Sequence, residues 1–232
     1  MSKSVVEEYD AWHAQLEDDG SLSEWHLLAR DYLDQGAVVT GRAVLEIGCG
    51  RGSFAEWLAA AGARLTAADF SPVAVDTART HSGYPSINWR VEDIQRLTFP
   101  DANFDVVVSC ETIEHVPEPL RAVRELTRVL RPGGILVLTC PNYLGPFGAY
   151  RAYLRMRGRR FQEAGQPINQ LTMLPRTKQW ARAAGLRIER ATSRGHYLPF
   201  PGRPPMRSRW LDRVAPLRGF GLHSAIRARK PV

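Results

Sequence analysis

One short string, Glu111-Thr-Ile-Glu114-His115, combines two carboxylates with an imidazole. The E-x-x-E-H spacing places Glu111, Glu114 and His115 within about one helical turn of one another. A neutral imidazole can take a proton from a hydroxyl near neutral pH, and the three groups together also suit Mg²⁺, Mn²⁺ or Zn²⁺. The string therefore predicts a general base or a divalent-metal site, and the alternative is a structural turn into the next helix.

A glycine-rich turn is the second chemical signal. The string Val44-Leu-Glu-Ile-Gly-Cys-Gly-Arg-Gly52 follows an apolar run, and its glycines let the backbone turn sharply beside a ligand. Position 53 is serine, so the loop lacks the G-x-G-x-x-G spacing that serves a pyrophosphate. Glu46 precedes the turn, and a carboxylate there favours a ligand that carries an ammonium group.

Two more carboxylates follow later apolar runs. Asp69 stands 21 residues after Gly48 and can accept hydrogen bonds from both ribose hydroxyls of a nucleoside. Asp93 and Ile94 offer a carboxylate and an apolar side chain where an adenine edge would lie. Each residue alone is also typical of an ordinary turn, but their order along the chain favours a nucleoside-containing ligand.

The elements that would position these residues alternate regularly. Apolar runs predict strands over residues 43–47, 65–68, 87–91, 104–109, 135–139 and 186–191. Helices are predicted over residues 53–61, 71–79, 120–130 and 177–184. This alternation predicts an α/β fold, a doubly wound, Rossmann-like sheet whose ligand lies at the carboxyl ends of the strands beside the first one. Residues 1–40 are expected to be helical.

The motifs in this order resemble those of the class I S-adenosylmethionine-dependent methyltransferases. VLEIGCGRG is similar to their first motif, LTAADFS to the second and VEDIQRLTF to the third, and FDVVVSCETIEHV and RVLRPGGILVLTCPN are similar to the fourth and fifth. The resemblance implies a single domain over 41–232 with a seven-stranded sheet, mostly parallel with a late antiparallel strand near 221–227. Residues 1–40 would then be a helical N-terminal lid.

The resemblance also implies a set of cofactor contacts. Glu46 and the glycines would face the methionine part of S-adenosylmethionine, Asp69 the ribose, and Phe70, Asp93 and Ile94 the adenine. The full set of implied cofactor-binding residues is Glu46, Gly48, Cys49, Gly50, Gly52, Asp69, Phe70, Asp93, Ile94 and Cys110.

For catalysis, the E-x-x-E-H string is similar to one in ubiquinone-biosynthesis O-methyltransferases and small-RNA 2′-O-methyltransferases, where it can hold a divalent ion such as Mg²⁺. Many methyltransferases with similar E-H-V strings hold no metal. The segment 165–172 departs from many relatives, because Pro167 stands where they carry a histidine. If that histidine acts as base or ligand in relatives, His196 or Tyr197 would have to replace it here.

Charge is divided unevenly along the chain. Residues 1–140 carry 12 basic and 21 acidic side chains, whereas residues 141–232 carry 19 basic and 3 acidic ones. The segments 141–175 and 194–218 fall between core elements on the ligand side, so they are expected to form the acceptor pocket. The excess of arginine predicts a basic surface there and an anionic partner.

Several acceptors fit this pattern. A small hydroxylated metabolite, anionic or glycosylated, is the first choice, and O-methylation is the expected reaction. RNA is the second choice, since arginine interleaved with aromatic residues can bind phosphates and stack bases. A quinone-like lipid reached from an anionic membrane surface is the third. A cofactor-binding regulator without activity is the alternative from another class.

Composition places the chain among ordinary globular proteins. It has 232 residues, 44% of them hydrophobic, and no apolar stretch approaches the roughly 20 residues needed to cross a bilayer. The first residues lack the apolar core of a signal peptide, which favours a cytoplasmic location. Three cysteines, Cys49, Cys110 and Cys140, lack metal-ligand spacing and are interpreted as buried packing residues.

Overall fold

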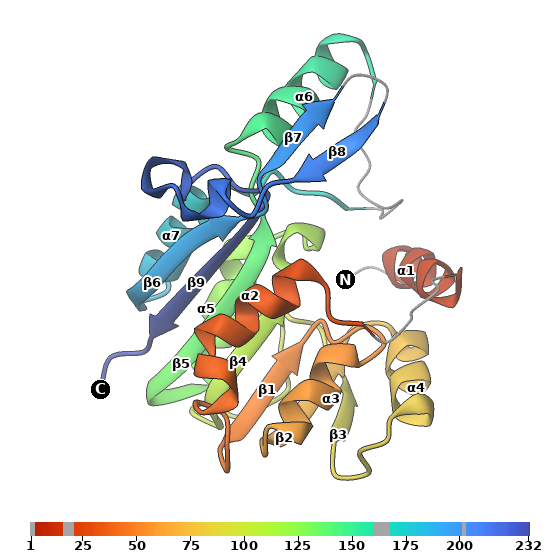
Figure 1. Cartoon of the computed structure of the whole chain (residues 1–232). Helices are drawn as coiled ribbons and strands as arrows, with labels where there is room; N and C mark the ends of the chain where they lie inside the picture. The colour runs from red at the N-terminus through yellow and green to blue at the C-terminus, as the bar shows by residue number, and fades with distance from the viewer. Residues whose placement is uncertain (1–2, 16–20, 160–167, 201–202) are drawn as a thin grey trace.

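Short apolar runs form the strands of one main sheet in the computed structural model, which describes residues 3–15, 21–159, 168–200 and 203–232. The strands of this sheet are β1 (Ala43–Ile47), β2 (Arg64–Asp69), β3 (Asn88–Val91), β4 (Phe104–Cys110), β5 (Leu130–Pro141), β6 (Arg187–Arg194) and β9 (His223–Arg229). Their spatial order is β3-β2-β1-β4-β5-β9-β6, as Figure 1 shows.

The sheet is parallel except at one strand. β1 pairs in parallel with β2 on one side and with β4 on the other, so the direction of chain progression reverses beside β1. β9 runs antiparallel to both of its neighbours, β5 and β6. The predicted Rossmann-like, seven-stranded, mostly parallel sheet with a late antiparallel strand is therefore confirmed. In such sheets ligands bind at the carboxyl ends of the strands next to the reversal.

Helices cover both faces of the sheet because its central strands are apolar on both sides. The helices are α1 (Lys3–Gln15), α2 (Glu24–Tyr32), α3 (Ser53–Ala60), α4 (Pro72–His81), α5 (Pro119–Val129), α6 (Pro146–Met156) and α7 (Leu174–Ala183). Along β4, Val106 and Val108 pack into the cluster that holds α2 and α3, and Val107 packs into the one that holds α5 and α7. This alternation follows from the two-residue period of a strand.

The N-terminal segment divides into two parts with different surroundings. α2 belongs to the core layer, since Leu28, Ala29 and Tyr32 are buried with α3 and the central strands. α1 lies instead against α4 at the carboxyl edge of the sheet, as Figure 1 shows at the right. Among the described residues of the 1–40 segment, α2 lies in the core layer and α1 at the carboxyl edge, so a lid role stays a prediction for α1.

Two segments extend beyond the carboxyl end of β5 in Figure 1. One contains α6, and the other contains the hairpin of β7 (Tyr197–Phe200) and β8 (Arg203–Arg207) with the short 3₁₀ helices η3 (Leu211–Arg213) and η4 (Ala215–Leu217). They fall within the segments 141–175 and 194–218 that the sequence assigns to the acceptor pocket. Two further 3₁₀ turns lie elsewhere, η1 (Asp34–Gly36) and η2 (Ile113–His115).

Several boundaries differ from the sequence prediction. α5 ends at Val129 and β5 begins at once at Leu130, so the Arg131–Gly134 segment extends the strand. α6 was not predicted, because Gly148 in its interior is typical of a break in a helix. A Cβ at Gly148 would lie 1.7 Å from the Tyr143 carbonyl oxygen, so only glycine lets this helix approach the preceding loop.

Candidate active site

The turn after β1 is shaped by glycine and held by β2. The backbone N–H groups of Gly48 and Cys49 both donate to the Ala68 carbonyl, at 2.8 and 3.0 Å. Gly48 has a φ of +83°, and a Cβ there would lie 2.0 Å from Thr112 Oγ1. Because Thr112 belongs to the E-x-x-E-H string, the glycine turn and that string are in direct contact.

Asp69 ends β2 and connects the glycine turn to α4. Its side chain is buried, with Oδ2 accepting a hydrogen bond from the Gly50 N–H and Oδ1 accepting one from the Ser71 N–H, both at 3.0 Å. Ser71 caps α4 by accepting from the Ala74 N–H. Each carboxylate oxygen has a second lone pair, so Asp69 can also accept from a ligand.

Glu46 lies buried beneath the turn. Burial, together with the nearby negative charge of Asp69, raises the pKa of Glu46 to about 8. In the described part of the chain its Oε2 has no hydrogen-bond partner. A positively charged group in the turn would favour the carboxylate form. The site therefore fits a ligand that carries an ammonium, as the methionine part of S-adenosylmethionine does.

A cavity opens at the carboxyl edge beside this turn. The residues that line it are Ile47, Gly48, Phe70, Glu92, Asp93, Ile94, Thr112, His115 and Val116. Gly48, Phe70, Asp93, Ile94 and His115 are all predicted site residues, so four separate strand ends bring them together. The other predicted site residues do not line this cavity: Glu46, Cys49, Gly50, Gly52, Asp69, Cys110, Glu111 and Glu114.

The cysteines are buried and unpaired, as the sequence interpretation expects. Burial raises the pKa of the Cys49 and Cys110 thiols well above their usual range, and it raises that of Cys140 to about 12. All three therefore stay protonated near neutral pH, and a thiol is a poor nucleophile in that form. Cys49 and Cys110 contribute packing near the turn.

His115 lies at the end of η2 with its ring orientation fixed. Its Nδ1 lies 2.7 Å from the carbonyl oxygen of Ile168, and its Nε2 lies 3.5 Å from Oε1 of Glu114. A carbonyl oxygen can only accept, so Nδ1 carries the proton and Nε2 holds the lone pair in the neutral ring. Glu114 is 1% exposed, which places a carboxyl group beside the basic nitrogen and away from water.

Glu111 faces another histidine. Glu111 directly follows β4 and has a φ of +47°, and its Oε2 lies 3.6 Å from Nδ1 of His223. The E-x-x-E-H string thus forms two carboxyl–imidazole pairs. Among the residues that the structure describes, no three His, Cys, Asp or Glu side chains gather to hold a metal ion. Glu111, Glu114 and His115 are therefore not such a group here, and a divalent ion at these residues stays a prediction.

His223 and Tyr9 are site residues that sequence reasoning missed. His223 begins β9, and its pairing with Pro141 places it at the carboxyl edge. The ring of Tyr9, from α1, lies 4.9 Å from that of Phe70 and 6.3 Å from that of His115. No sequence motif predicts either residue, because each is brought to the site by the packing of an element that is distant in sequence.

Tyr9 shares a hydrogen-bond acceptor with His115. Its hydroxyl donates to the Ile168 carbonyl at 3.5 Å, the same oxygen that accepts from His115 Nδ1. Burial raises the pKa of the Tyr9 phenol, so the hydroxyl keeps its proton and remains a donor. α1 thereby contacts both the aromatic wall of the cavity and the histidine.

His196 does not take the place of a missing histidine. Its Nδ1 lies 2.7 Å from Asp212 Oδ1, and its Nε2 lies 2.9 Å from the Leu217 carbonyl oxygen. Both ring nitrogens are engaged in joining the hairpin to η3 and η4, which makes His196 structural. Pro167 lies outside the described residues. Tyr197 is described at the start of β7, half-buried.

Comparison with known proteins agrees with this geometry. Residues 45–138 match the model of a methyltransferase domain. A ubiquinone biosynthesis O-methyltransferase of Coxiella burnetii is 30% identical over 190 residues, which cover 78% of this chain and 79% of that protein. The chain belongs to the S-adenosylmethionine-dependent methyltransferases.

Two further similarities extend the comparison. A ubiquinone biosynthesis O-methyltransferase of Xanthomonas campestris is 38% identical over 130 residues, or 53% of this methyltransferase and 54% of the relative. A chain in the complex between the Haloferax volcanii Trm112 methyltransferase activator and a methyltransferase is 23% identical, with a TM-score of 0.72 over 98% of both chains. The second similarity shows the fold alone.

The uneven charge is partly neutralised inside the molecule. Three ion pairs join arginines of the C-terminal part to acids of the N-terminal part: Arg194 with Asp31, Arg207 with Glu24, and Arg227 with Asp34. The predicted basic surface is therefore smaller than the sequence charge suggests. In the described parts of the chain, no helix has the length and apolar character needed to span a membrane.

Proposed function

We propose that this methyltransferase transfers the methyl group to a hydroxyl oxygen of a small acceptor, with His115 as the general base. The observation that carries the proposal is the 2.7 Å contact between His115 Nδ1 and the Ile168 carbonyl oxygen. This contact fixes the tautomer in which Nε2 is basic. An imidazole in that state can accept a proton near neutral pH.

S-adenosylmethionine supplies a methyl group that is already activated by a positively charged sulfur. The protein then has to align the acceptor oxygen and remove one proton, and alignment is worth up to about 7–11 kcal/mol. The hydroxyl proton would pass to Nε2 of His115 as the carbon–oxygen bond forms and the carbon–sulfur bond breaks, with S-adenosylhomocysteine as the leaving group. Glu114, buried 3.5 Å from Nε2, stabilises the imidazolium that results. Glu111 and His223 form the second pair beside the acceptor.

We expect the cofactor contacts in the order that the sequence predicts. Glu46 and the turn with Gly48, Gly50 and Gly52 would hold the methionine part, and their support is the raised pKa of the buried Glu46. Asp69 would hold the ribose through its remaining lone pairs.

Adenine would lie at the carboxyl edge, where the cavity of about 20 Å³ would have to widen to hold it. Phe70, Asp93 and Ile94 line this cavity, and Asp93 Oδ1 already accepts from the Gln95 N–H at 2.9 Å. α1 would act as a lid, because Tyr9 contacts Phe70 and His13 lies 3.8 Å from the position of a Cβ at Gly50. Cofactor exchange would then require α1 to move.

The test measures transfer of tritiated methyl from S-adenosylmethionine to a panel of hydroxylated aromatic acids and sugar phosphates. With the best acceptor, His115→Ala should lower turnover about 10²–10⁴-fold, because general-base catalysis is lost. The affinity for S-adenosylhomocysteine should stay within about twofold. His81→Ala, at an exposed position on α4, is the matched control and should leave turnover unchanged.

Three outcomes would contradict the proposal. Full turnover by His115→Ala would show that His115 is not the general base. Loss of wild-type turnover in EDTA, with recovery in Mg²⁺, would show that a metal ion activates the hydroxyl instead. Failure of every hydroxylated compound on the panel would contradict the acceptor class. The pH profile gives a further check, since the acidic limb of the wild-type profile should disappear in the variant.

A further inference from the structure

A second cavity, of about 620 Å³, lies between the edge strand β6 and the segment that holds η3 and η4. Six of the nine residues that line it are arginines. These are Arg190, Arg194, Arg207, Arg209, Arg213 and Arg218. The other three are Ala191, Thr192 and Asp212, so a single carboxylate faces six guanidinium groups. We call it the arginine cavity.

Ion pairs within the protein neutralise only part of the positive charge of these arginines. Arg194 pairs with Asp31, and Arg207 pairs with Glu24 and with Asp212. Arg190 has its guanidinium 4.4 Å from the ring centre of Tyr32, which fixes its position without neutralising it.

Three arginines remain without such compensation. Over residues 3–15, 21–159, 168–200 and 203–232, no carboxylate lies within ion-pair distance of Arg209, Arg213 or Arg218. Asp212 is already engaged by His196 and Arg207. Like charges held close together repel one another, and a polyanion between them would relieve that repulsion.

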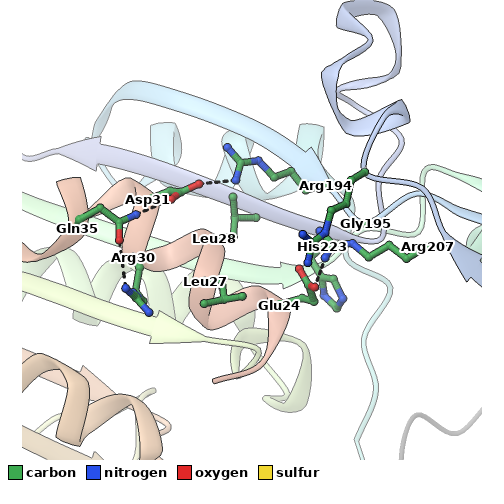
Figure 2. A pocket seen from close by; sticks show the side chains of 11 residues that line it. Glu24, Leu27, Leu28, Arg30, Asp31, Gln35, Arg194, Gly195, Arg207 and His223 are labelled. Carbon is green, nitrogen blue, oxygen red and sulfur yellow. Dashed lines mark hydrogen bonds and ion pairs between the residues drawn. The ribbon is translucent and has the colours of Figure 1, made fainter. Parts of the chain in front are cut away.

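The arginine cavity continues toward the reaction site. A neighbouring cavity of about 330 Å³ shares Arg194, Arg207 and Arg209 with it and reaches His223. Figure 2 shows this neighbouring cavity, with Arg194 and Arg207 beside His223 and the acids of α2 opposite. His223 in turn faces Glu111. A molecule with one end in the arginine cavity could therefore extend to the carboxyl edge of the sheet.

We propose that the arginine cavity binds the phosphate or diphosphate group of the acceptor. That this group belongs to the acceptor rests on the proposed function, whereas the binding of a phosphate group in the cavity does not. The planar guanidinium forms paired hydrogen bonds with phosphate oxygens, which makes arginine the usual residue for this recognition. The volume lies within the range of small-molecule sites, about 300–1,000 Å³. Several uncompensated positive charges favour a diphosphate over a single carboxylate.

The lining of the cavity favours a small molecule over RNA. Single-stranded RNA is held by a basic groove together with aromatic side chains on which bases stack. Among the described residues that line the arginine cavity, none is aromatic. A phosphorylated small acceptor needs only the positive charge that these residues provide.

The experiment titrates the full-length protein with inorganic diphosphate by calorimetry at low salt, with and without S-adenosylhomocysteine. The two test variants are Arg213→Ala and Arg218→Ala, whose side chains are exposed, so the fold should be retained. Each should weaken diphosphate binding at least about tenfold, the loss expected for a charge-assisted contact. Arg182→Ala, exposed on α7 outside the cavity, removes the same charge and should change affinity less than twofold.

Several outcomes would overturn the proposal. These are no measurable diphosphate binding, equal losses in Arg182→Ala and the test variants, or tighter binding of oligouridylate than of diphosphate with loss in the same variants. Binding to phosphatidylglycerol vesicles in place of diphosphate would overturn it as well. Diphosphate binding without methylation of any hydroxylated compound would leave this proposal intact and contradict only the proposed function.

Discussion

The two sides of the carboxyl edge are built by different means. Beside β1, the turn is held by backbone hydrogen bonds and by close packing that only glycine permits, as where Gly48 lies against Thr112. Beside β6 and β9, arginines are held by acids far away in sequence, such as Arg194 by Asp31. The first side is fixed by sterics. The second is fixed by side-chain ion pairs, which single substitutions can change.

The largest effect that tests this contrast is expected at Gly48. Gly48→Ala places a methyl group 2.0 Å from Thr112 Oγ1 and forces a left-handed φ on a residue with a side chain. The free energy of unfolding should fall by about 2–5 kcal/mol, and S-adenosylhomocysteine binding should be lost. Urea denaturation and calorimetry measure the two effects. Gly83→Ala, where no atom lies within 4 Å of the new Cβ, is the control.

Asp69→Ala comes next in size. The variant removes an acceptor that two backbone N–H groups use, and it removes the proposed ribose contact. Affinity for S-adenosylhomocysteine should fall about 10–100-fold, from the loss of about 1.5–3 kcal/mol in charge-assisted hydrogen bonds. Asp76→Ala on the exposed face of α4 is the matched control. Unchanged affinity in Asp69→Ala would show that the ribose is held elsewhere.

Glu46→Gln tests the charge beneath the turn. The pKa of Glu46 is raised to about 8, so in the free protein this group favours folding in its protonated form. That contribution is complete below about pH 4.5 and is lost as the pH rises through 8. Glu46→Gln should therefore raise the melting temperature at pH 9.

A bound ammonium reverses this preference, because it favours the carboxylate. Binding of S-adenosylhomocysteine to the wild type should release a proton near pH 7, and affinity should rise between pH 6 and 8. In Glu46→Gln the affinity should be about tenfold weaker at pH 8 and nearly independent of pH. Calorimetry in two buffers with different ionisation enthalpies measures the proton release. Identical pH dependence in both proteins would contradict the assignment.

The smallest effect on stability is expected from the ion pairs beside β6 and β9. Asp31→Ala breaks a pair with Arg194 whose side chains are 38% and 32% exposed, so solvent screens it. The free energy of unfolding should fall by only about 0.2–1 kcal/mol, and less at 1 M NaCl. Urea denaturation at two salt concentrations checks this. A loss as large as that of Gly48→Ala would erase the contrast between the two sides.

The sequence predicted those features that depend on a few consecutive residues. The glycine turn at 48–52 and the strands predicted over 43–47, 65–68, 104–109 and 135–139 follow from short strings read in order. Boundaries were less accurate, because Gly133 adopts a positive φ within a strand and Gly148 lies inside a helix. Propensity alone predicts a break at both.

The missed residues depend on tertiary packing. Tyr9 reaches the site from a helix with no motif, and His223 reaches it through the register of β9. The E-x-x-E-H spacing predicted a general base or a divalent-ion site, but it gave no sign of the backbone turn at Glu111, whose φ is positive and whose Oε2 lies 3.6 Å from Nδ1 of His223. Spacing along the chain cannot reveal such a turn, since it depends on the loop after β4.

The position of β9 has a consequence for how the chain reaches its fold. β9 lies between β5 and β6, although it is synthesised after β6. Until β9 is in place, β6 has no partner in the sheet and β5 presents an open edge. Open strand edges invite pairing with other chains, so this is the stage of folding at which aggregation competes with folding.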